Sequence, residues 1–173
     1  MKKGISAGLL LVALALGASG PAPAQQDVVV LDAETLEIGG EVFRLHGIDA
    51  PEEGQRCWLK SHLFDCGMVA RTALLDLVTG SAVTCRRVTG ASTAGTDAKP
   101  ARCFAAGYDL SEGMTYTGWA LADRRTGERY ARFEAGAREA KRGLWRGDFV
   151  MPWDWRSGSR LPQEGGNAAQ PAQ

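Results

Sequence analysis

Two runs of alternating hydrophobic and polar residues, joined by two glycines, constrain the fold more than any other feature of the sequence. Residues 35–38 alternate, Gly39 and Gly40 follow, and residues 41–45 alternate again. Both glycines tolerate the positive φ angles of a tight two-residue turn, so the pattern predicts a β-hairpin. Pro51 follows shortly afterwards and ends strand pairing.

Further runs along the chain predict three strands and three helices. Apolar or alternating runs predict strands at residues 28–31, 82–88 and 101–106. Helical spacing of apolar residues, together with capping residues, predicts helices at about 60–78, 109–118 and 128–142. Short strands with interposed helices indicate an α+β domain built on a small antiparallel barrel.

The N-terminus has the features of an export signal. Lys2 and Lys3 precede an apolar run over residues 8–16, and Ala22-Pro23-Ala24 offers a small-residue cleavage site. The alternative, a membrane anchor, would need about 20 apolar residues. We therefore expect a signal peptide over 1–24, a single domain over 25–156 and no membrane span in the mature chain. The chain would be secreted or periplasmic.

Residues 157–173 are rich in Gly, Gln, Pro and Ala without periodicity, which predicts a disordered tail. Without residues 1–24 the chain has 18 Lys and Arg against 20 Asp and Glu, a formal charge of −2. Tight nonspecific binding of nucleic acid usually needs a basic surface. Nucleic acid is therefore expected to bind weakly, and we expect a monomer.

The four cysteines are Cys57, Cys66, Cys85 and Cys103. An even count in an exported chain favours two disulfides. Antiparallel pairing of residues 82–88 with 101–106 would bring Cys85 and Cys103 face to face, which leaves Cys57 for Cys66. The alternative is a zinc site, but spacings of 9, 19 and 18 residues contain no close pair of ligands.

The residues around the hairpin have the side chains needed for phosphate chemistry. We expect the hairpin to bring Glu34, Arg44, Asp49 and Glu52 to one end of the barrel. Clustered carboxylates repel one another unless a hard cation such as calcium lies among them. A carboxylate beside that ion can activate water, and a guanidinium can bind phosphate oxygens.

These motifs resemble the staphylococcal nuclease family, whose pattern is Asp-Gly-Asp-Thr followed by Arg-Leu-x-x-Ile-Asp-x-Pro-Glu. Here the two parts read Asp32-Ala33-Glu34-Thr35 and Arg44 to Glu52. The likeness continues through Gly118-Trp119-Ala120, Gly143-Leu144-Trp145 and residues 149–156, and it spans about residues 27–156. It implies a five-stranded OB-fold β-barrel with three α-helices, and ancestral calcium-dependent hydrolysis of DNA and RNA.

The resemblance also implies roles for individual residues. Glu34 and Asp49 would hold calcium, and the Ala50 carbonyl would complete the metal shell. Glu52 would be the general base, and Arg44 would neutralise phosphate charge.

Three departures weaken the expected activity. Ala33-Glu34 replaces Gly-Asp in the first motif, Ala98 stands where the family has a second catalytic arginine, and Asp123 replaces a nucleotide-stacking tyrosine. Loss of a transition-state arginine can cost on the order of 10³–10⁵ in rate. Lys99 is adjacent but lacks the planar fork of a guanidinium.

Three functions follow as alternatives. The first is a nuclease-like protein that keeps calcium or phosphate binding, with phosphodiesterase activity weak or lost. The second is a non-catalytic binding or structural module that serves another envelope protein, with Arg44 and Glu52 forming a structural ion pair. The third is an active nuclease with a substitute cation from residues 86–102.

Overall fold

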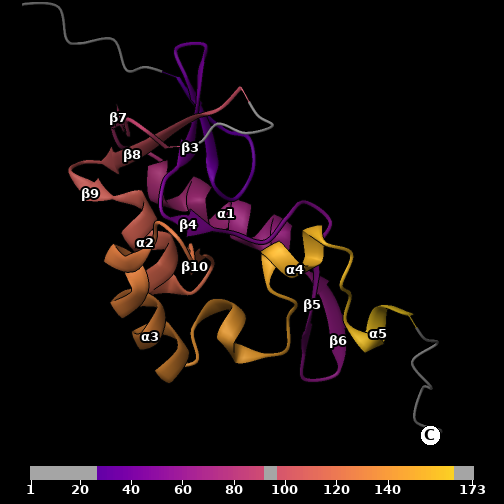
Figure 1. Ribbon diagram of the computed structural model, residues 1–173. Coiled ribbons are helices and arrows are strands. Elements are labelled where there is room, and N and C mark those ends of the chain that lie inside the picture. Colours follow the sequence, from indigo (N-terminus) through magenta and orange to yellow (C-terminus); the bar gives the residue numbers. More distant parts are fainter. Residues whose placement is uncertain (1–26, 92–96, 166–173) are drawn as a thin grey trace, which may run out of the picture.

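The computed structural model of the chain describes residues 27–91 and 97–165 (Figure 1). The predicted signal peptide lies outside these residues. The strands are β1 (Val28–Val30), β2 (Thr35–Ile38), β3 (Glu41–Leu45), β4 (Ile48–Asp49), β5 (Arg56–Leu59), β6 (His62–Asp65), β7 (Val83–Arg87), β8 (Lys99–Ala105), β9 (Tyr108–Asp109) and β10 (Leu121–Ala122). The helices are α1 (Cys66–Val78), α2 (Leu110–Thr117), α3 (Ala131–Glu139), α4 (Pro152–Arg156) and α5 (Pro162–Gly165), with 3₁₀ turns at Glu128–Tyr130 and Gly143–Arg146.

The largest sheet has the strand order β1-β2-β3-β8-β7, and β9 pairs with β8. Its neighbours are antiparallel except for β3 and β8, which run parallel. Gly39 and Gly40 have φ angles of 59° and 79°, so the hairpin predicted between β2 and β3 is confirmed. Helices α1 and α2 lie against this sheet in Figure 1, and their buried residues join its core.

The predicted α+β class is confirmed. The described residues contain more elements than the expected five strands and three helices. Two short antiparallel pairs, β4 with β10 and β5 with β6, form separate sheets, and α4 and α5 follow α3. Within residues 27–91 and 97–165 no pairing joins β1 to β7, so a closed barrel stays a prediction. In this part of the chain, no helix is both long and apolar enough to cross a membrane.

The predicted start of the first helix was wrong. Helix α1 begins at Cys66, and the residues before it form the β5–β6 hairpin, in which Cys57 pairs with Phe64. The spacing of Leu63 fits a helical stripe, but tertiary pairing overrides that local preference. The Asp65 carboxylate accepts a hydrogen bond from the Met68 amide at 2.8 Å and caps the helix.

Both predicted disulfides are confirmed. Cys85 and Cys103 face each other across β7 and β8 with their Cα atoms 4.0 Å apart. Cys57 and Cys66 have Cα atoms 5.6 Å apart and join the β5–β6 hairpin to the start of α1. No free cysteine is found among the described residues, so the zinc alternative has no thiolate ligands there.

The later helices largely follow the prediction. Asp109 caps α2 by accepting hydrogen bonds from the Ser111 and Glu112 amides, and Gly118 ends it at a φ of 79°. The last predicted helix is shorter than expected, since residues 128–130 form a 3₁₀ turn before α3. The structure describes residues 157–165 of the predicted tail, where α5 follows the buried Leu161.

Candidate functional site

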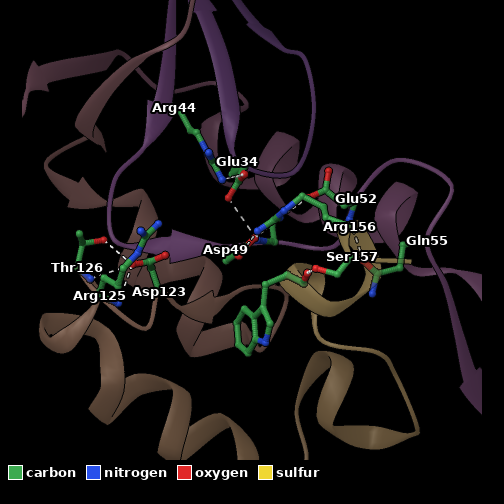
Figure 2. A network of polar contacts seen from close by, with 12 residues as sticks. Glu34, Arg44, Asp49, Glu52, Gln55, Asp123, Arg125, Thr126, Arg156 and Ser157 are labelled. Atoms are coloured by element: carbon green, nitrogen blue, oxygen red, sulfur yellow. Dashed lines mark hydrogen bonds and ion pairs between the residues drawn. The ribbon is translucent and has the colours of Figure 1, made fainter. Parts of the chain in front are cut away.

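The hairpin and the strand after it bring the predicted site residues together (Figure 2). Glu34 directly precedes β2, and Thr35 pairs in register with Arg44 on β3. Asp49 lies on β4, whose partner is Leu121 on β10. Glu52 lies in the loop after β4, so four expected functional side chains meet at one end of the main sheet.

Glu34 is buried against two partners. Its Oε1 atom lies 2.6 Å from Nη2 of Arg44, and its Oε2 atom accepts a hydrogen bond from the Ala50 amide at 3.3 Å. The pKa of Glu34 is raised to about 8, mainly by burial. The Arg44 guanidinium lowers this pKa, whereas the nearby carboxylates of Asp49 and Glu52 add to the increase. Glu34 therefore favours its protonated form near neutral pH.

Asp49 and Glu52 share one partner, the guanidinium of Arg156. Its Nη1 and Nη2 atoms donate to Oδ1 and Oδ2 of Asp49 at 2.8 and 2.7 Å. The same Nη1 atom also donates to Oε1 of Glu52. Hydrogen bonds to both carboxylates raise the pKa of Arg156, which keeps it charged. The planar guanidinium of Arg156 therefore binds the buried Asp49 carboxylate through two hydrogen bonds and the Glu52 carboxylate through a third.

A buried glutamine holds the two halves of this cluster in place. Gln55 is fully buried; its Oε1 atom accepts a hydrogen bond from the Glu52 amide, and its Nε2 atom donates to the Val150 carbonyl at 2.7 Å. Val150 lies just before α4, which carries Arg156. The loop with Glu52 and the segment with Arg156 are therefore tied together by one side chain.

An open pocket of about 450 Å³ lies beside the cluster. Three arginines, Arg44, Arg125 and Arg156, line it together with Asp49 and Asp123. Burial would raise the pKa of Asp123, but hydrogen bonds from Thr126 and from the Arg125 amide lower it overall. The pocket thus combines three guanidinium groups with carboxylates that are already hydrogen-bonded.

A calcium ion does not fit this arrangement of donors. Both oxygens of Asp49 are bound by Arg156, and those of Glu34 are bound by Arg44 and the Ala50 amide. Nowhere in residues 27–91 or 97–165 do three or more His, Cys, Asp or Glu side chains form a group able to hold a metal. The oxygen-rich shell that calcium needs is therefore not free.

The structure places the other predicted residues as follows. Arg44 and Glu52 do not pair with each other, since each binds a different partner. Ala98 is buried and supplies no charge. Lys99 binds Glu41 at 2.7 Å, so it is directed away from the cluster.

Sequence reasoning missed Arg156 as a site residue. It lies in the segment Trp153-Asp154-Trp155-Arg156, which resembles the family ending, but no local pattern assigns it a role. Its partner Asp49 is 107 residues earlier in the chain. Only a tertiary contact identifies it.

Comparison with known proteins gives one informative relative. No family model matches the chain. The chain is 33% identical over 150 residues to the succinoglycan biosynthesis protein ExoI of Rhizobium meliloti (strain 1021), and the match covers 80% of this chain and 74% of that protein. Identity at this level over most of both chains indicates common descent. The chain therefore belongs to the family of the succinoglycan biosynthesis protein ExoI.

Proposed function

We propose that this protein is an exported, staphylococcal-nuclease-like module that binds phosphodiesters in the cell envelope and in which the ancestral hydrolysis is attenuated or lost. The observation that carries the proposal is the position of Arg156, which binds both Asp49 and Glu52 beside an arginine-lined pocket. The sheet with order β1-β2-β3-β8-β7 would correspond to the OB-fold barrel of that family.

The arrangement supports weak or absent hydrolysis. Glu52, the expected general base, has one of its two carboxylate oxygens hydrogen-bonded to Arg156, so part of its capacity to accept a proton from water is already used. The nearby cations of β7 and β8 are engaged elsewhere. Arg87 and Lys99 bind Glu41, Arg102 binds Asp109, and Arg86 lies over the Phe104 ring. These contacts weigh against a substitute for the missing second arginine, whose loss costs on the order of 10³–10⁵ in rate.

The same arrangement supports binding of a phosphodiester. Arg44 keeps 40% of its side chain exposed while one of its nitrogens contacts Glu34. Arg125 and Arg156 line the same pocket. Guanidinium groups bind phosphate oxygens through paired, charge-assisted hydrogen bonds, so an anionic diester is the ligand class that best suits the pocket.

The relative and the disulfides support an envelope setting. The matched relative is named for succinoglycan biosynthesis, and two disulfides suit an oxidising compartment outside the cytoplasm. In the non-catalytic alternative, the module binds an anionic polymer or another envelope protein. Secretion and that partner are parts of this proposal, whereas calcium-dependent nuclease activity is the alternative that it argues against.

The proposal is tested on the exported, oxidised protein with a fluorescein-labelled single-stranded DNA oligonucleotide. Anisotropy measures binding and a denaturing gel measures cleavage, each in calcium and in chelator. We expect the wild-type protein to bind the oligonucleotide, and Arg44→Ala to weaken this binding at least tenfold. We expect no calcium-dependent cleavage by wild type, so Glu52→Gln should leave the gel unchanged. Rapid calcium-dependent cleavage that Glu52→Gln removes would contradict the loss of hydrolysis. Wild-type binding no tighter than that of Arg44→Ala would contradict the binding role.

A further inference from the structure

We propose that Arg156 is the resident cation of the acidic cluster and takes the place that a divalent metal would otherwise occupy. The inference rests on the proposed function, since the resemblance to the nuclease family identifies Asp49 and Glu52 as residues of a metal-dependent site. Arg156 excludes calcium, and its removal frees the two carboxylates of Asp49 and Glu52 for a weak calcium site whose other ligands would be water.

The contacts of Asp49 carry the first step. Its side chain is 4% exposed, so its charge needs a counterion. The Arg156 fork satisfies both Asp49 oxygens at 2.8 and 2.7 Å. A metal ion could bind those oxygens only after the guanidinium had left.

The position of Glu52 carries the second step. One guanidinium nitrogen of Arg156 donates to Glu52 as well as to Asp49, so a single cation bridges the carboxylate on β4 and the carboxylate in the loop after it. A bridging cation between carboxylates is also the role of a divalent metal. Arg44 and Glu34 lie on the other side of the cluster and bind each other, so Arg44 does not compete for this position.

The anchoring of α4 carries the third step. Gln55 binds the Val150 carbonyl, and Trp58 exchanges two backbone hydrogen bonds of 2.8 Å with Asp148. Pro152 at the start of α4 is fully buried. The backbone that presents Arg156 is therefore fixed by contacts that do not involve the arginine itself, and we expect the segment to stay in place when Arg156 is replaced.

Calorimetric titration of calcium chloride into the exported, oxidised protein tests the inference. Wild-type protein should show no binding heat up to about 5 mM calcium, whereas Arg156→Gln should bind with a Kd of about 1 mM or tighter. Arg160→Gln is the matched control, because Arg160 lies in the same segment and donates to the Trp155 carbonyl outside the cluster. It should behave as wild type.

Wild-type calcium binding within tenfold of the Arg156→Gln value would overturn the inference. A folded Arg156→Gln protein that binds no calcium would overturn it too. Should that variant fail to fold, nitrogen-15 spectra of the wild-type guanidinium groups decide the question. The Nη protons of Arg156 should give resolved signals that exchange slowly with water and do not change when calcium is added. Loss of these signals on calcium addition would contradict the inference. Oligonucleotide binding in chelator is measured separately, and its absence would remove the proposed function without affecting the calcium comparison.

Discussion

Arg156 and Asp49 lie 107 residues apart in the chain and form a two-point ion pair, with both carboxylate oxygens accepting from the guanidinium. The pair connects the C-terminal segment to strand β4. A site that would be strongly acidic by sequence is thereby neutralised within the protein. This relationship determines which chemistry the site supports.

The anchor residue Gln55 gives the first prediction. Gln55→Leu removes the partners of the Glu52 amide and the Val150 carbonyl, so the free energy of unfolding should fall by about 1–3 kcal/mol. Urea unfolding measures the change. Thr72→Ala, which removes an exposed hydrogen bond on α1, should change stability far less. Equal effects of the two substitutions would argue against an anchoring role for Gln55.

The buried Glu34 gives a second prediction, on pH. Burial raises the pKa of Glu34 from 4.5 to about 8. Between about pH 4.5 and pH 8, the Glu34 carboxyl therefore stays protonated in the folded protein and is ionised in the unfolded chain. Stability contributed by the protonated group is complete below about pH 4.5 and is lost as pH rises towards about 8.

Urea unfolding of wild type and Glu34→Gln at about pH 5 and about pH 8 checks this sign. The wild-type free energy of unfolding should fall by more than about 1 kcal/mol over this range, since one pKa unit corresponds to about 1.4 kcal/mol. Glu34→Gln cannot titrate and should show a smaller fall. A wild-type stability that rises over the same range would show that Glu34 is ionised in the folded protein.

The two disulfides should differ in their effect on the site. Loss of either cross-link frees the unfolded chain and should lower stability by about 2–4 kcal/mol. The Cys57–Cys66 disulfide fixes the backbone next to Gln55, whose carbonyl accepts a hydrogen bond from the Cys66 amide. Replacing Cys57 and Cys66 by alanine removes that constraint and should weaken oligonucleotide binding as well. Replacing Cys85 and Cys103 should leave binding unchanged under conditions where the protein is folded. Weaker oligonucleotide binding after loss of Cys85–Cys103, with unchanged binding after loss of Cys57–Cys66, would contradict this prediction.

Local patterns predicted much of this fold. The Gly39-Gly40 turn, the facing of Cys85 and Cys103 and the cap at Asp109 depend on residues close in sequence or on a simple strand register. The start of α1 was predicted wrongly because the stripe through Leu63 fits a helix, whereas pairing with Trp58 places that residue in a strand. Tertiary contacts decided the outcome there.

The candidate site was predictable only in part. The hairpin motif brought Glu34, Arg44, Asp49 and Glu52 to one place, as their spacing suggested. Their partners were not predictable, because Arg156 reaches the cluster through a long-range contact that no periodicity or motif encodes. The cation beside the carboxylates therefore had to be found in three dimensions.

The most direct test of the account is a crystal structure of the protein grown with calcium and a phosphodiester such as a dinucleotide phosphorothioate. The account predicts Arg156 nitrogens within about 3 Å of both Asp49 oxygens, with the phosphate group bound near Arg44 and Arg125 and no metal at the carboxylates. Calcium bound to Asp49, with Arg156 turned out towards solvent, would contradict it.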